Sequence, residues 1–247
     1  MNKAISEIQS ITIVGQGNVA WLYNNIMTKQ GFAVNCISSR KEIRKEDLEA
    51  DLIIIAVSDK AIEEVISKFR LENNILVHTS GTMDIDILRN SAKNYGVFYP
   101  LQTISKAIEV DFSNIPLCVE GSDENTFSLL NNFANKLSKK VYKISSSQRK
   151  DIHIAAVFAN NFTNHLFGIA KQELEKKDIP FEILFPLIDQ TIAKIKENTP
   201  FEVQTGPAKR GDNLIMESHK SRLGDDEREI YKLLSEKIIK KDKELKR

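Results

Sequence analysis

A glycine-containing turn joins an apolar segment to a helical pattern near the start of the chain. Residues 11–14 read ITIV, the turn that follows has the form Gly-x-Gly-x-x-Ala, and 18–29 has the periodicity of an amphipathic helix. The first glycine of such a turn permits a tight bend, the second allows close approach of a phosphate, and the small third residue lets helix and strand pack closely. The helix N-terminus offers unpaired N–H groups to an anion.

The turn therefore predicts a site for the pyrophosphate of a dinucleotide; a purely structural turn is the alternative. The expected contacts are Gly15, Gln16, Gly17, Asn18 and Val19.

The residues after the second predicted strand, 32–37, indicate which dinucleotide is bound. NAD-binding proteins usually place Asp or Glu there to hold the ribose hydroxyls. This chain has Ser38, Ser39 and Arg40 instead. A carboxylate would repel a 2′-phosphate, whereas two hydroxyls and a guanidinium can bind it. We expect NADP, with a solvated polar turn as the alternative.

The order of apolar and helical segments predicts an α/β domain followed by a helical one. Short apolar segments alternate with helical patterns, as in βαβ units that form a doubly wound, predominantly parallel sheet. Predicted strands cover 11–14, 32–37, 52–57, 75–78, 117–120 and 141–144, and predicted helices cover 18–29, 60–70, 84–94 and a segment that begins near residue 123. After a capping box at Ser145 and Gln148 only helices are expected, at 149–177, 182–198, 212–222 and 225–244. We expect a Rossmann domain over 1–148 and an all-α domain over 149–247.

Charge and hydropathy exclude several classes of partner. The net charge is +1, so no extended basic surface for nucleic acid is expected. No apolar stretch approaches the length of a membrane span, and no signal-peptide pattern precedes the first strand, so we expect a cytoplasmic protein. Cys36 and Cys118 lie far apart in predicted strands, which favours buried thiols over a disulfide or a metal site.

Polar residues follow further predicted strands, at the edge of a parallel sheet where ligands bind. Val57 and Ser58 end one strand, and Thr79 begins the loop after another; we expect all three to contact the cofactor. We expect the adjacent Ser80 and Gly81 to contact substrate. His78 is a candidate proton donor, although a histidine packed beneath the loop is the alternative. In the loop 99–103, Gln102 could bind a substrate oxygen or its own backbone.

The first helix of the second half carries short neutral polar residues on one face. His153, Asn160 and Asn164 fall on one side of a regular helix, whereas a solvated face would be rich in Lys and Glu. This stripe favours a cleft, with a polar domain or dimer interface as the alternative. We expect His153, with Asn160 or Asn161, to protonate and orient a substrate.

Several motifs together give the chain a family resemblance. These motifs are VGQGNVA at 14–20, DLIIIAVSDKAI at 51–62, VHTSGT at 77–82, FYPLQTIS at 98–105, HIAAVFANNFTNHL at 153–166 and TGPAKRGD at 205–212. The chain resembles the Rossmann-like proposed NADP oxidoreductases whose C-terminal part is a domain of unknown function. These are relatives of pyrroline-5-carboxylate reductase and, more distantly, of the 6-phosphogluconate and 3-hydroxyisobutyrate dehydrogenases.

The resemblance implies a Rossmann domain, a helical domain and, often, homodimers. It implies that polar residues of the first C-terminal helix face the nicotinamide; the related dehydrogenases place a lysine there, where this chain offers Lys150 or His153. It also implies that the loop 205–212 approaches the cleft, where Arg210 could bind an anionic substrate group. A structural pair of Arg210 with Asp212 is the alternative.

The expected function is therefore NADP-dependent transfer of a hydride to or from a C=O or C=N group of a small molecule, in a cleft between the domains. A protein that senses NADP without turning it over is the alternative. A methyltransferase that uses S-adenosylmethionine is less favoured, because such enzymes usually place an acidic residue where this chain has Ser39 and Arg40.

Overall fold

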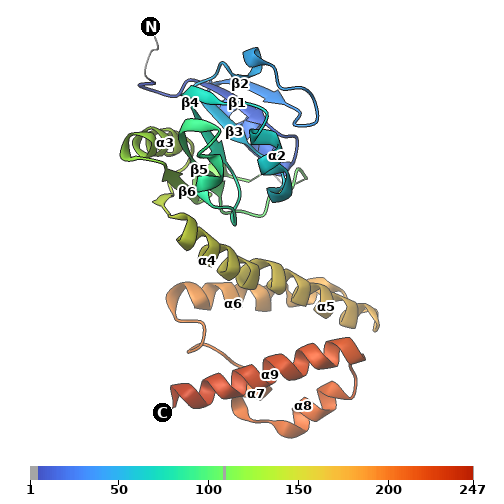
Figure 1. The fold of residues 1–247 in the computed structure, drawn as a ribbon. Coiled ribbons are helices and arrows are strands. Elements are labelled where there is room, and N and C mark those ends of the chain that lie inside the picture. Colours follow the sequence, from blue (N-terminus) through green and yellow to red (C-terminus); the bar gives the residue numbers. More distant parts are fainter. Residues whose placement is uncertain (1–4, 108–109, 247) are drawn as a thin grey trace. The chain divides into compact units, whose positions relative to one another are not determined.

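The computed structural model describes residues 5–107 and 110–246, and the chain forms two compact units, residues 1–157 and 158–247. The first unit is α/β and the second is helical (Figure 1), as the sequence predicts. The division into functional domains after residue 148 stays a prediction. None of the helices in the described residues is long and apolar enough to cross a membrane.

The first unit is built on a seven-stranded sheet in the order β2-β1-β3-β4-β5-β6-β7. Neighbouring strands from β2 to β5 are parallel, β6 is antiparallel to β5, and β7 is parallel to β6. The strands are β1 (Ser10–Val14), β2 (Ala33–Ile37), β3 (Leu52–Ile55), β4 (Leu71–His78), β5 (Ala92–Pro100), β6 (Leu117–Gly121) and β7 (Val141–Lys143). After β1 the chain forms β2 on one side of β1 and then returns to form β3 on the other side of β1. This reversal creates a crevice at the carboxyl ends of β1 and β3, where ligands bind in such sheets.

The helices cover both faces of the sheet, which explains why its central strands are apolar throughout. They are α1 (Asn18–Lys29), α2 (Ile62–Ile66) and α3 (Glu124–Leu137); α4 (Ser146–Ala156) follows β7 at the end of this unit. Alternate residues of β3 enter opposite cores, with Leu52 and Ile54 in one cluster and Ile53 and Ile55 in the other. Short 3₁₀ turns complete several connections.

One predicted helix is wrong. Residues 84–94 form a single 3₁₀ turn, Ile85–Leu88, followed by the start of β5. The turn ends because the chain joins the sheet: the Ser91 carbonyl accepts the Leu71 N–H at 2.8 Å, and the Ser91 hydroxyl donates to the Ile66 carbonyl at 3.0 Å.

The prediction of a buried Cys36 is also wrong. Cys118 is buried, but Cys36 is exposed because β2 is an edge strand.

The second unit contains α5 (Thr163–Glu175), α6 (Phe185–Glu197), α7 (Pro207–Arg210), α8 (Asn213–Lys220) and α9 (Asp225–Leu245). A π-helical segment, Val157–Phe162, connects α4 to α5. A π-helix turns less per residue than an α-helix, because each hydrogen bond spans five residues. The regular spacing that placed His153, Asn160 and Asn164 on one side therefore does not hold through this segment.

Candidate functional site

A groove of about 910 Å³ lies in the first unit, where the turns after β1, β2, β3 and β4 meet. Strand register explains the meeting: Val14 pairs with Ile55, and Ile55 pairs with His78, so the next residues of all three strands emerge side by side. The predicted residues that line the groove are Gln16, Gly17, Asn18, Val19, Ser38, Ser39, Arg40, Val57, Ser58, Thr79, Ser80, Gly81 and His153. Lining residues that the sequence did not single out are Ala56, Asp59, Ala61, Glu64, Val65, Lys68 and Thr82.

The two glycines of the first turn have different roles. Gly15 is buried with φ +144°, and a Cβ built there would lie 2.1 Å from the Ala56 carbonyl oxygen, so only glycine fits beneath the groove. Gly17 borders the groove, and a Cβ there would meet no described atom within 4 Å. The helix that begins after Gly17 has no side-chain cap and no acidic residue in its first turn. Its N–H groups therefore suit a pyrophosphate.

The groove wall after β2 carries the residues expected to bind a 2′-phosphate. Ser38 and Ser39 are half-buried, and Arg40 is exposed and forms no ion pair with a described residue. Two carboxylates also line the groove, and each has a partner. Asp59 accepts a hydrogen bond from the Thr82 hydroxyl at 2.5 Å, and Glu64 accepts one from the Lys68 ammonium at 3.2 Å.

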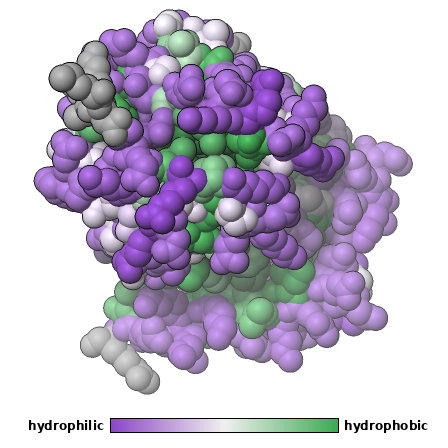
Figure 2. Space-filling model, turned by 45° about the horizontal axis from the view of Figure 1, so that its top comes forward, coloured by the Kyte–Doolittle hydropathy of each residue, from purple (hydrophilic) through white to green (hydrophobic). Residues whose placement is uncertain are grey.

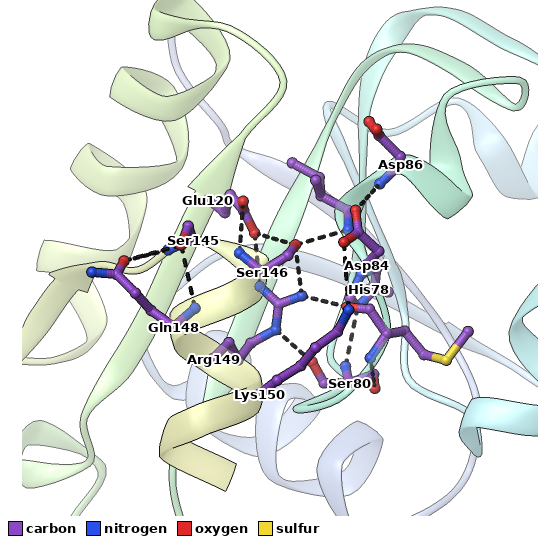
Figure 3. A network of polar contacts seen from close by, with 12 residues as sticks. His78, Ser80, Asp84, Asp86, Glu120, Ser145, Ser146, Gln148, Arg149 and Lys150 are labelled. Atoms are coloured by element: carbon purple, nitrogen blue, oxygen red, sulfur yellow. Dashed lines mark hydrogen bonds and ion pairs between the residues drawn. The ribbon is translucent and has the colours of Figure 1, made fainter.

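A buried arginine fixes the loop after β4 (Figure 3). Arg149 of α4 is fully buried, and its guanidinium donates to the carbonyls of Ser80 (3.1 Å) and Met83 and to the Glu120 carboxylate (2.7 Å). The same carboxylate accepts hydrogen bonds from the backbone N–H and hydroxyl of Ser146. The Ser80 hydroxyl accepts the N–H groups of Thr82 and Met83 at 3.1 and 3.0 Å. The loop that lines the groove is therefore held by partners behind it.

Sequence reasoning missed Arg149 and Glu120. Arg149 lies in a polar segment, Glu120 follows the apolar residues of a strand, and neither belongs to a motif that distinguishes a buried charge from a solvated one. Their pairing connects β6 to α4 across 29 positions.

His78 lies beneath the groove and does not line it. Its imidazole is fully buried, and its Nδ1 accepts the Ser80 N–H at 3.2 Å. Burial, and next the positive charge of Arg149, lowers the pKa of His78 to about 4. The ring is therefore neutral at neutral pH. This placement corresponds to the packed histidine that the sequence left as the alternative.

His153 reaches the groove from α4 and packs against Gly81. A Cβ at Gly81 would lie 2.8 Å from His153 Nδ1 and 3.1 Å from the Tyr99 hydroxyl oxygen. Glycine is therefore required where loop, imidazole and phenol meet.

The remaining predicted residues do not line the groove. Gln102 is exposed, and its side-chain oxygen accepts the Thr103 N–H at 2.8 Å. Arg210 is exposed and donates to Asp212 at 2.9 Å, which is the structural pair left open by the sequence. Asn160 and Asn161 are exposed in the second unit. Within the described residues, no group of three or more His, Cys, Asp or Glu is arranged to hold a metal ion.

The fold and the glycine turn define a Rossmann-type nucleotide-binding protein. The family model described as a domain of unknown function, DUF2520, matches residues 115–238. A proposed NADP oxidoreductase from Bacteroides fragilis is similar over 94% of this chain and 98% of its own, with 34% identity and a TM-score of 0.84. The chain belongs to the DUF2520 family.

More distant solved structures share the fold. A protein from Thermotoga maritima has 20% identity and a TM-score of 0.70 over 96% of this chain and 100% of its own. A reductive aminase from Aspergillus terreus, solved in complex with NADPH and ethyl levulinate, has 13% identity and a TM-score of 0.70 over 94% of both chains. No curated protein matches the sequence significantly.

Proposed function

We propose that the protein is an NADP-dependent oxidoreductase that acts on a C=O or C=N group of a small molecule. One observation is the main support for the proposal: a single groove combines an uncapped helix N-terminus at Gly17 with Ser38, Ser39 and an Arg40 that forms no ion pair within residues 5–107 and 110–246. The first arrangement suits a pyrophosphate and the second a 2′-phosphate. The similarity to the Bacteroides protein, named as a proposed NADP oxidoreductase, supports the same assignment.

Different residues along the groove would bind different parts of the cofactor and the substrate. The turn 15–19 would bind the pyrophosphate, and 38–40 would bind the 2′-phosphate. When bound, NADP supplies the hydride chemistry. Thr79, Ser80 and Gly81 would orient the reacting groups, and His153 would supply or accept the proton. His78 is the weaker candidate because it is buried and does not line the groove. The roles of Asn160, Asn161, Gln102 and Arg210 and the position of a substrate between the domains stay predictions.

A protein that binds NADP without turnover remains the second candidate, because the lysine of the related dehydrogenases has no evident counterpart. Lys150, the lysine of α4, lies 3.6 Å from the Asp84 carboxylate and does not line the groove. Loss of turnover in His153→Gln with NADPH binding intact would distinguish an enzyme from a sensor, with keto acids and cyclic imines as test substrates.

We also propose that the protein forms a homodimer through its helical unit. Large apolar side chains are exposed in the helical unit. On the face of the molecule that Figure 2 draws, hydrophobic residues appear between hydrophilic ones. The most exposed in the helical unit are Phe158, Ile183, Leu187, Phe201, Leu214, Leu233 and Leu245. Large apolar side chains that gather in one exposed patch are typical of an interface, and we propose that these residues form one.

Arg40→Ala tests the cofactor assignment. Removing the guanidinium removes a charge-assisted contact to the 2′-phosphate, so NADPH affinity should fall roughly tenfold or more while NADH affinity changes little. Lys41→Ala is the matched control, because Lys41 is the adjacent exposed cation and does not line the groove. Equal losses for NADPH and NADH in Arg40→Ala would contradict the assignment.

A further inference from the structure

Two polar groups meet at Gly81 without a hydrogen bond between them. His153 Nδ1 is buried and has no partner among the described residues. The Tyr99 hydroxyl forms no hydrogen bond to any described residue either. The position of a Cβ at Gly81 would lie 2.8 Å from His153 Nδ1 and 3.1 Å from the Tyr99 hydroxyl oxygen, so both atoms border the same point of the loop and a movement of the rings toward each other would pair them. A buried polar atom without a partner is unfavourable, which favours that movement.

The fold brings this pair to the ligand-binding edge of the sheet. Tyr99 lies near the carboxyl end of β5, which runs parallel to β4 and so ends beside the loop that carries Gly81. His153 lines the groove although its Nδ1 is buried, so other atoms of this residue border the groove. Hydrogen bonds at catalytic groups are often long before ligand binds and shorten in the complex.

We propose that Tyr99 is a positioning residue whose hydroxyl donates to Nδ1 of His153 and thereby holds the Nε2–H of the neutral ring toward the groove. The tautomer of a histidine is set by the partner of its other nitrogen. With Nδ1 as an acceptor, the proton resides on Nε2, where it can donate a hydrogen bond to the oxygen or nitrogen of a bound substrate. The substrate part of this inference rests on the proposed function; the contact between the two rings does not.

The protonation of Tyr99 fits a donor role. Burial, and next the neighbouring Cys118, raises the pKa of Tyr99. The phenol therefore keeps its proton at neutral pH. The glycine at position 81 is also consistent with a contact between the two rings, because the Cβ of an alanine there would be too close to both His153 and Tyr99.

The test is the tautomer of His153 in full-length protein, measured by ¹⁵N correlation spectra of the imidazole rings, with His153→Gln to assign the signals. Tyr99→Phe keeps the ring and removes the hydroxyl. The ratio of Nε2–H to Nδ1–H tautomer should fall about fivefold, the equilibrium effect of one ordinary hydrogen bond. Tyr95→Phe is the matched control, because the Tyr95 hydroxyl is on the same strand and contacts Arg89 and Asp86 instead.

An unchanged tautomer ratio in Tyr99→Phe would overturn the inference. NADPH affinity, measured on the same samples, should stay within about twofold of the parent value, because Tyr99 does not line the groove. If the parent protein binds no NADPH, the proposed function fails, while the spectra still decide whether Tyr99 holds His153. Retained fluorescence of Trp21, the single tryptophan, confirms that each variant is folded.

Discussion

At the scale of single residues, the buried charges behind the groove determine how the loop after β4 is held. Arg149 and Glu120 form an ion pair whose members also bond to the loop and to Ser146, and removal of one partner from a buried pair is strongly destabilising. The groove-lining residues next to Gly15 were predictable, because glycine turns and strand ends have recognisable local chemistry. The Arg149–Glu120 pair was not, because burial of a charge depends on which distant segments meet.

The buried His78 leads to a prediction of how the unfolding free energy depends on pH. Its folded pKa of about 4 lies below the usual value of 6.5, so below pH 6.5 the unfolded state binds the extra proton and stability falls. This group alone should remove about 3 kcal/mol of unfolding free energy as the pH falls from 7 to 4. Urea unfolding followed by Trp21 fluorescence should show that His78→Asn lacks this loss, whereas His165→Asn, at an exposed histidine, retains it. Parallel pH curves for parent and His78→Asn would show the prediction to be wrong.

At the scale of elements, predictions were reliable where local signals and tertiary contacts agree. The capping box predicted at Ser145 is present: its hydroxyl accepts the Gln148 N–H at 3.3 Å, and Gln148 accepts the Ser145 N–H at 3.0 Å. The segment 84–94 was misjudged because its apolar spacing suits one helical turn, and pairing with β4 then determines the rest. The π-helical segment 157–162 carries no sequence signal that distinguishes it from an α-helix.

The capping box at Ser145 leads to a prediction about the stability of the first unit. Ser145→Ala removes the acceptor for an N–H group at the start of α4 and should lower the unfolding free energy of the first unit by about 1 kcal/mol. Ser147→Ala, two residues further along the same turn, should change it by less than about 0.5 kcal/mol, because Ser147 is exposed. Urea unfolding monitored by Trp21 fluorescence measures both values. Equal effects of the two substitutions would contradict the role assigned to the cap.

At the scale of the whole molecule, the fold class, the order of the α/β and helical parts and most groove residues could be predicted from the sequence. The position of β5 between β4 and β6, and with it the place of Tyr99, could not, because strand order depends on long-range pairing. The exposed apolar residues of the helical unit also emerged only from the structure. Helical periodicity shows that a face is apolar but not what covers it.

The homodimer is the prediction for the assembled protein. Light scattering should give a mass near twice the 28.0 kDa of the chain. Replacing Ile183 and Leu187, which are 64% and 66% exposed, by glutamate should produce a monomer, because charges would be buried in an apolar interface. Lys194→Glu on the same helical region should leave the dimer intact. A monomeric parent protein at micromolar concentration would refute the proposal.

The central claim is that the groove at the carboxyl ends of β1 and β3 binds NADP. Its most direct test is a calorimetric titration of the full chain with NADPH, NADH and S-adenosylmethionine. The account predicts saturable binding of NADPH that is roughly tenfold or more tighter than that of NADH, with no binding of S-adenosylmethionine. Absence of NADPH binding would reduce the glycine turn to a structural element and would contradict the proposed function.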